Sequence, residues 1–282
     1  MTIANVANWA PTQHDILSIA SNLSLTNLSP LTSGYGLVSN GALAAPGFQL
    51  IPAGFSINTQ VFTYTGSTQN YTPTSGCQSA IVICVGGGGG GGGSNAGGSG
   101  TLSASCGGNG GAVAMSIIAS PTTETITIGA GGAGGAANSA GSSGTATTYS
   151  TIVEAQGGGG GVATDSHTGS KNSAAQFWAE PSVPSLSSSV GNILITGGAG
   201  GSGRGGYFGS GLLFSIGGAG GNCMFGGGAP AGWGNADTQS GAGNNALGYG
   251  GGGSGAWNCT NGANTTGGNG GNGICIILEF IT

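Results

Sequence analysis

Charged side chains are scarce in this chain. Lysine and arginine number 2, and aspartate and glutamate number 7, among 282 residues. The two cations, Lys171 and Arg204, stand far apart in the sequence. Proteins that bind nucleic acid neutralise several phosphates with clustered basic side chains, and attraction to an anionic membrane surface needs the same clusters. We therefore expect binding neither to nucleic acid nor to an anionic membrane.

Long apolar runs, a leader sequence and clustered metal ligands are also missing. No apolar run approaches the about 18 residues of a membrane-spanning helix, so we expect no membrane insertion. The first residues lack the basic start and apolar stretch of a signal peptide, which indicates synthesis in the cytoplasm. The aspartates Asp15, Asp165 and Asp237 stand alone. The 6 cysteines show no C-x-x-C spacing, so the sequence predicts no metal site.

Motifs of catalysis are weak. Asp165-Ser166-His167 has the residue types of a hydrolytic triad, but adjacent residues rarely face one another as a proton relay needs. Gly169-Ser170-Lys171 lacks the Gly-Lys-Ser/Thr order of a phosphate-binding loop, and G-x-G-x-x-G occurs throughout the glycine tracts by composition alone. We expect no enzyme and no cofactor.

Glycine is the residue that is abundant, at 68 of 282 positions. The chain is nevertheless 37% hydrophobic and 3% charged, whereas disordered segments are poor in apolar residues and rich in charge. Collagen is excluded because the Gly-X-Y period is missing and the 9 prolines are an ordinary number. Eight glycines, Gly86 to Gly93, directly follow the apolar run Ala80 to Val85. This junction favours ordered glycine tracts anchored on β-strands.

The conformation that suits bare backbone is polyproline II, with three residues per turn and no internal hydrogen bonds. Its N–H and C=O groups must find partners in neighbouring segments, and glycine allows close approach. We expect a polyglycine-II helix bundle of unequal rods. The glycine-rich tracts lie near residues 86–100, 106–111, 129–135, 157–161, 196–206, 217–221, 226–234, 241–255 and 262–273.

Apolar and β-branched segments between the tracts predict a small antiparallel β unit, so the fold class is mainly β. Residues 125–128 alternate polar and apolar side chains, which is typical of a strand with one solvent-exposed face. The segments 81–85 and 274–278 are continuously apolar and are predicted to be buried on both faces. The expected strands are Phe62–Thr65, Ile81–Val85, Ala112–Ile118, Glu124–Ile128, Thr147–Ala155, Ile193–Thr196 and Ile274–Phe280.

Residues 1–55 differ from the rest because they hold little glycine before Gly34. Pro11 to about Asn22 is predicted to form one short helix. The segment is too short and too sparsely apolar for a core of its own. We interpret 1–55 as an N-terminal attachment or oligomerisation segment and 56–282 as a glycine-rich receptor-binding domain.

The order of these segments resembles the glycine-rich domain at the end of bacteriophage tail fibres, and the tip adhesin of T-even-like phages, over roughly residues 60–282. The resemblance implies a polyglycine-II sandwich with receptor-binding loops at its far end. It also implies a virion protein that attaches to a host polysaccharide or outer-membrane protein, joins other tail proteins and forms a homotrimer. It rests on Phe62-Thr63-Tyr64, Tyr71-Thr72-Pro73, Ala80–Val85 with Gly86–Gly93, Ile126–Gly132, and Gly267–Gly273 with Ile274–Phe280.

Aromatic residues on the segments between tracts are the candidate receptor-binding residues. A bundle of closely spaced backbones cannot bury such rings, so they must lie at its ends or flanks. Two interpretations remain open: the rings cap the bundle and pack on the β unit, or several form an exposed binding surface. The candidates are Phe177, Trp178, Tyr207, Phe208, Phe225, Trp233, Tyr249 and Trp257.

Two other classes of function compete with a tail-fibre tip. One is a glycine-rich structural surface protein or virion component without receptor binding, which predicts regular Gly-Gly-Ala/Asn triplets throughout. The other is an enzyme on a glycine-rich scaffold, which the scarcity of charged clusters disfavours.

The cysteines are not expected to form a common site. Cys84 and Cys275 are expected to be small buried hydrophobes. Cys77, Cys106, Cys223 and Cys259 lie at segment boundaries and leave room for one disulfide.

Overall fold

The computed structural model describes residues 56–96, 98, 100–163, 185–208, 212–236 and 238–282, and the backbone of six strands outside these ranges. The chain separates into two compact units, Met1–Ser56 and Ile57–Ile281. The described residues are mainly β, and none of them belongs to a helix long and apolar enough to cross a membrane.

The N-terminal unit contains two strand pairs. β1 (Ile16–Ile19) pairs antiparallel with β2 (Leu25–Leu28), and β3 (Tyr35–Val38) pairs with β4 (Gly47–Leu50). The predicted helix is therefore wrong at residues 16–19, while its other residues lie outside the described part of the chain. A helix of this length is marginal without tertiary support, and the β-branched Ile16 and Ile19 favour a strand.

Two antiparallel sheets form a β unit in the second compact unit. The larger sheet has the order β15-β9-β7-β21-β5, and the smaller has the order β12-β11-β10-β6. The predicted single strand at 147–155 is two strands, because Ser150 takes a positive φ of 49° in the turn between them. The strands are β5 (Ser56–Thr63), β6 (Gln69–Tyr71), β7 (Cys77–Val85), β9 (Val113–Ala119), β10 (Glu124–Thr127), β11 (Thr147–Tyr149), β12 (Val153–Ala155), β15 (Ile193–Ile195) and β21 (Ile274–Ile281).

The main hydrophobic core lies between these two sheets. Val82 and Ile277 of the larger sheet pack with Ile126 and Val153 of the smaller one. Burial alternates along β10, as its sequence predicts. It also alternates along β7 and β21, so the prediction that both are buried on two faces holds only near Val85 and Ile274, and the other side chains of the second face are half-buried or exposed. Among the described residues, the second face of the larger sheet is covered only at one end, by Phe225 and its neighbours.

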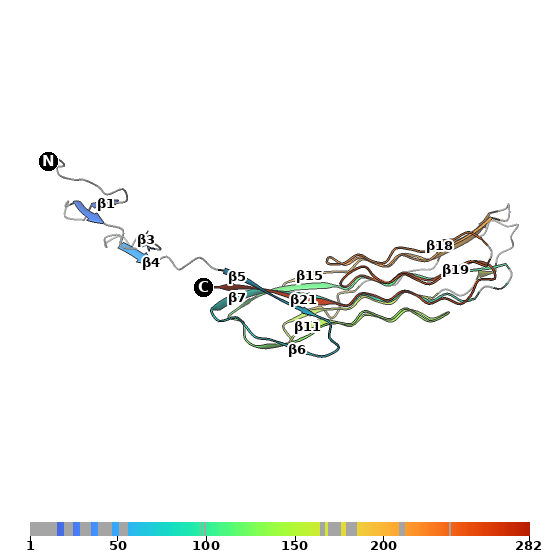
Figure 1. Cartoon of the computed structure of the whole chain (residues 1–282), viewed down its shortest axis with the longest axis horizontal. Helices are drawn as coiled ribbons and strands as arrows, with labels where there is room; N and C mark the ends of the chain where they lie inside the picture. Colours follow the sequence, from blue (N-terminus) through green and yellow to red (C-terminus); the bar gives the residue numbers. More distant parts are fainter. Residues whose placement is uncertain are drawn as a thin grey trace. The chain divides into compact units, whose positions relative to one another are not determined.

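Glycine-rich tracts run from the β unit to the opposite end of the second unit, where β18 and β19 lie (Figure 1). The tract 86–94 is their centre, and its hydrogen bonds repeat every third residue. Gly86, Gly89 and Gly92 donate to tract 106–112 (2.9 Å each). Gly87, Gly90 and Gly93 donate to tract 139–145 (2.9–3.0 Å). Gly88, Gly91 and Ser94 donate to tract 265–271 (2.8–2.9 Å).

The carbonyls of the same tract accept hydrogen bonds from three further segments (2.8–2.9 Å). The carbonyls of residues 87 and 90 accept from Gly158 and Gly161. The carbonyls of residues 88 and 91 accept from Gly132 and Gly135, and the carbonyls of residues 89 and 92 accept from Gly253 and Ala256. The tract therefore bonds to six separate segments. The three segments that accept its N–H groups run antiparallel to it, and the three that donate to its carbonyls run parallel.

In the outer tracts, every third position is occupied by a residue with a side chain instead of glycine. Ala133 and Ala136 are exposed in one outer tract, and Asn269 and Asn272 are exposed in another. At each glycine from 86 to 93, by contrast, an added Cβ would collide with the backbone of a neighbouring tract. The number of neighbouring tracts thus decides whether a position must be glycine.

Two small sheets close the far end of the unit. One has the order β13-β8-β20-β19 and the other β14-β16-β17-β18. We call the second one the distal sheet. The strands are β8 (Thr101–Ala104), β13 (His167–Thr168), β14 (Gln176–Trp178), β16 (Arg204–Phe208), β17 (Leu212–Ile216), β18 (Trp233–Gly234), β19 (Ser240–Gly241) and β20 (Trp257–Asn258).

Candidate functional site

The register of the distal sheet aligns four residues across its strands. Trp178 pairs with Arg204, Arg204 with Ile216, and Ile216 with Trp233. Directly opposed residues of an antiparallel sheet share one face, so the side chains of Arg204, Ile216 and Trp233 lie on the same side of the sheet. Trp233 is 63% exposed, and Arg204 is exposed as well. We call this the distal sheet face; Phe214, two positions from Ile216 on β17, lies on it too.

The opposite face of the distal sheet is fixed on the layer beneath it. Tyr207 and Leu213 are buried with Leu102 and Cys259. The Ser215 hydroxyl donates to the Ser103 carbonyl at 2.8 Å. The Tyr207 hydroxyl lies 3.2 Å from Oγ1 of Thr260. Tyr207, a predicted receptor-binding residue, is therefore a packing residue that holds the distal sheet in place.

Trp257, another predicted residue, is half-buried in a slot lined by glycine. A Cβ added to Gly232 would lie 2.6 Å from Nε1 of Trp257, and one added to Gly241 would lie 2.5 Å from it. The ring thus occupies space that these two glycines leave open. We infer that Trp257 supports β18 from beneath, while its neighbour Trp233 faces outward.

Phe225 and Tyr249 lie at the other end of the tracts. Phe225 packs against Val85 and Ile274, where the larger sheet of the β unit meets the glycine tracts. Tyr249 is partly exposed beside Gly226. The structure therefore does not bring the eight predicted aromatics to one end.

For the remaining predicted residues the structure gives backbone positions. Trp178 and Phe177 lie on β14, at the edge of the distal sheet, and Phe177 aligns with Gly205. Phe208 ends β16 opposite Leu212. The segment 204–214, which contains Arg204 and Phe214, was predicted to belong to the receptor-binding end, whereas Ile216 was not predicted. The sequence around these residues alternates large and small side chains after a glycine tract. A buried strand shows the same alternation, so the pattern does not identify a binding face.

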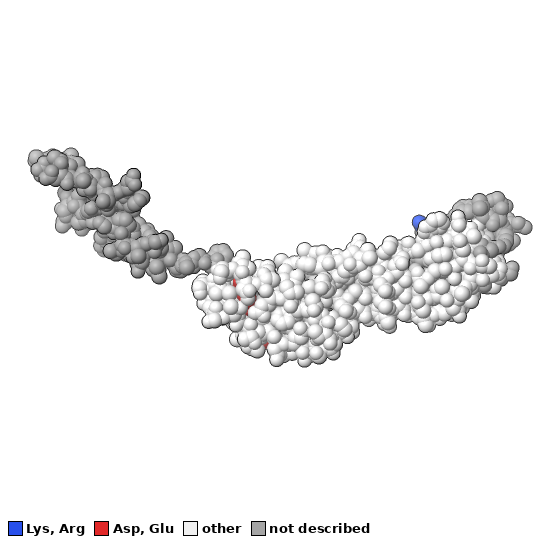
Figure 2. All heavy atoms as spheres, viewed as in Figure 1, with Lys and Arg blue, Asp and Glu red and all other residues white. Residues whose placement is uncertain are grey.

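Charge is separated along the second unit (Figure 2). Arg204, the one cation in the described part of the chain, lies on the distal sheet face. The described carboxylates are those of Glu124, Glu154 and Glu279, and all three belong to strands of the β unit. The distal sheet face is thus aromatic and apolar with one guanidinium group.

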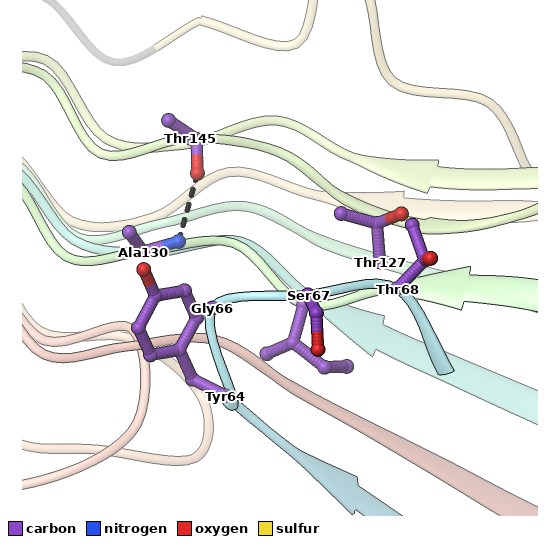
Figure 3. Close-up of a pocket in the computed structure, with 8 residues that line it drawn as sticks. Tyr64, Gly66, Ser67, Thr68, Thr127, Ala130 and Thr145 are labelled. Carbon is purple, nitrogen blue, oxygen red and sulfur yellow. Dashed lines mark hydrogen bonds between the residues drawn. The ribbon is translucent and has the colours of Figure 1, made fainter.

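A separate pocket opens in the β unit (Figure 3). Its cavity volume is about 430 Å³. Hydroxyl groups line it, and the backbone N–H of Ala130 donates to Oγ1 of Thr145 at 2.8 Å at its edge. No charged side chain is among the lining residues, which are Tyr64, Gly66, Ser67, Thr68, Thr127, Ile128, Ala130 and Thr145.

A family model of a glycine-rich domain matches residues 63–278, which extend from the end of β5 almost to the end of β21. The chain belongs to this glycine-rich domain family. No curated protein matches the chain. The match covers the glycine tracts, the distal sheet and the β unit apart from most of β5 and the last residues of β21, so the glycine-rich domain includes both candidate sites.

The β unit buries the carboxylate of Glu279, and in the described part of the chain no cation lies beside it. Glu279 on β21 accepts hydrogen bonds from Tyr71 (2.8 Å), from the backbone and side chain of Thr74 (2.9 and 2.6 Å), and from Asn58 and Gln60 on β5 (2.8 and 3.2 Å). Burial acts to raise the pKa of Glu279, but the hydrogen bonds outweigh it and lower the pKa to about 2. The charged carboxylate therefore ties together β5, the loop before β7, and the C-terminal strand.

The described part of the glycine-rich domain holds no group of three or more histidine, cysteine or acidic side chains that could bind a metal ion. All six cysteines are free thiols. Cys84 and Cys275 are buried, as predicted, and their sulfur atoms lie 3.8 Å apart across β7 and β21. Asp165 and Ser166 of the triad-like sequence lie outside the described residues.

Proposed function

We propose that this chain is the receptor-binding component of a bacteriophage tail fibre, carried on the virion, and that it attaches to the host through the distal sheet face. The observation that carries the proposal is the exposed ring of Trp233 in one row with Ile216 and Arg204. Exposed aromatic and arginine side chains on a rigid support are typical of the residues that dominate binding interfaces.

We propose further that the glycine tracts form a polyglycine-II bundle. The three-residue repeat of hydrogen bonds along residues 86–94 supports this geometry, because polyproline II has three residues per turn and no internal hydrogen bonds. The six hydrogen-bonded neighbours explain how glycine tracts can be ordered with hardly any side-chain packing. Such a bundle would act as a stiff spacer between the β unit and the distal sheet face.

The chemistry of the distal sheet face suits a host polysaccharide or an outer-membrane protein. A tryptophan ring offers a flat apolar surface with one polar N–H. The Arg204 guanidinium carries five N–H donors in a fixed planar arrangement. Both kinds of receptor present groups that these side chains can contact.

Attachment to the virion requires a second surface, and we propose that the exposed face of the larger sheet contributes to it. Ile117 on β9 is 72% exposed, and Ile57 and Val61 on β5 are exposed on the same face. Exposed apolar patches of this kind usually mark protein interfaces. The face would join identical subunits, as in a homotrimer, or other tail proteins, together with residues 1–55.

The test is attachment of the purified full chain to a panel of bacterial strains. Trp233→Ala should weaken attachment to a strain that binds the wild type by about thirtyfold, because a central aromatic contact contributes about 2 kcal/mol or more. Leu247→Ala is the matched control, since Leu247 is also exposed but lies near Gly227, away from the distal sheet. Equal binding by wild type and Trp233→Ala would contradict the proposed site. Attachment to no strain would favour a structural component without receptor binding.

A further inference from the structure

The pocket of Figure 3 is built from three segments of the β unit. The turn between β5 and β6 supplies Tyr64 and Thr68, and Gly66 makes the turn possible with a φ of +79°. Thr127 ends β10, and Thr145 comes from a returning glycine tract. The buried Ile128 forms an apolar part of the wall. The residues that line the pocket are thus held by two sheets and a tract rather than by one mobile loop.

The hydroxyl groups of the pocket have unused hydrogen-bonding capacity. Within the described part of the chain, the side-chain hydroxyls of Tyr64, Thr68 and Thr127 make no hydrogen bond to protein. Oγ1 of Thr145 accepts from the Ala130 N–H, so its own proton is available to donate. Each hydroxyl can both donate and accept. The pocket therefore contains several uncharged hydroxyl groups that can both donate and accept hydrogen bonds, beside one aromatic ring.

These features select the chemistry of a ligand. A charged ligand would find no counter-ion, because no charged side chain lines the pocket. A purely apolar ligand would leave the hydroxyls without partners, which is costly once water is displaced. The volume of about 430 Å³ lies within the range of small-molecule sites, about 300–1,000 Å³. An uncharged ligand with many hydroxyls and one apolar face satisfies all three conditions.

We propose that this pocket binds a neutral hexose unit of a glycan. The apolar face of the sugar ring packs on Tyr64, which is 42% exposed, and the sugar hydroxyls bond to Thr127 and Thr145. The site goes beyond the proposed receptor-binding surface. It lies on the β unit, whereas the distal sheet face lies at the other end of the glycine tracts, so either could fail without the other.

The experiment is an NMR titration of the full chain with methyl α-D-glucopyranoside, methyl β-D-galactopyranoside, methyl α-D-mannopyranoside and N-acetylglucosamine. At least one of these sugars should shift the backbone amide signals of Gly66, Thr68 and Ala130, with a Kd of about 1 mM. Tyr64→Ala should raise that Kd at least tenfold. Tyr249→Ala is the matched control, because this tyrosine is 41% exposed and lies outside the pocket, and it should leave the Kd unchanged.

Thr127→Val provides a second variant that keeps the side-chain shape and removes one hydroxyl. It should weaken binding several-fold without altering the melting curve, since the hydroxyl has no protein partner in the described chain. Three results would overturn the proposal: no amide shift with any of the four sugars, unchanged affinity in both Tyr64→Ala and Thr127→Val, or tighter binding of glucuronic acid than of the neutral sugars. Attachment to cells through Trp233 is measured separately and does not bear on these outcomes.

Discussion

The backbone of Gly88 faces that of Gly251 so closely that a methyl group on Gly88 would collide with the Gly251 carbonyl. The N–H of Gly88 donates to the carbonyl of Gly271 (2.9 Å), and its carbonyl accepts from the N–H of Gly132 (2.8 Å). A side chain here would have to separate several tracts at once. Gly88 is therefore an interior packing position, although it has no side chain.

We expect Gly88→Ala to lower the free energy of unfolding by about 2 kcal/mol or more, in the upper range of overpacked cores. Gly227→Ala is the control, because the nearest atom to its added Cβ would be Cβ of Leu247 at 3.9 Å. Urea unfolding of both variants provides the comparison. Equal stability of Gly88→Ala and wild type would contradict the close packing of the tracts.

Trp233 and Trp257 are close in the structure but should respond differently to truncation. Trp233→Ala removes an exposed ring and should leave the melting temperature nearly unchanged. Trp257→Ala empties the slot beside Gly232 and Gly241 and should cost about 3 kcal/mol. Thermal unfolding followed by circular dichroism measures both. Similar destabilisation by the two variants would show that Trp233 is a packing residue as well.

Stability should fall in acid through Glu279. Its folded pKa is about 2, below the ordinary value of 4.5. The stabilisation is therefore fully present above about pH 4.5 and is lost as the pH falls towards 2; it amounts to at most about 3 kcal/mol. Unfolding measured at pH 7 and pH 3 should show this loss in the wild type. Glu279→Gln should be less stable at pH 7 and should lose less between the two pH values.

The thiols should react slowly with alkylating reagents at neutral pH. Burial raises the pKa of Cys106 and Cys223, and the contact with Cys275 together with burial raises the pKa of Cys84. The thiolate is the reactive form. Mass spectrometry after brief iodoacetamide treatment should find the half-buried Cys77 and Cys223 labelled before Cys84 and Cys106. Rapid labelling of Cys84 would mean that β7 and β21 separate easily.

A charged residue on the exposed sheet face should disrupt self-association. We expect the wild-type chain to sediment as an oligomer and Ile117→Asp to shift it towards the monomer, because the new carboxylate would be buried without a partner. Ile152→Asp changes an exposed isoleucine in the turn between β11 and β12 and should have no effect. If the wild type is monomeric, this face does not join identical subunits, and its partner must be another protein.

The sequence predicts the β unit well because its strands carry dense apolar runs between glycine tracts, as at 81–85 and 274–280. The distal strands escape prediction because they are short and rich in glycine, and only their register shows that Trp178, Arg204 and Trp233 belong together. The side chain at every third residue of the outer tracts is visible in the sequence. That these side chains point away from the bundle cannot be predicted from the sequence, because it depends on which tracts are neighbours in the folded protein.

The pairing of tract 86–94 also constrains how the protein can fold. Its six neighbouring segments extend along the sequence from residue 106 to residue 271. Contacts so distant in sequence form slowly, because the intervening chain must be ordered before they contribute. The hydrogen bonds of tract 86–94 therefore cannot all form until residue 271 is available to pair. We expect the tracts to assemble in one cooperative step rather than one after another.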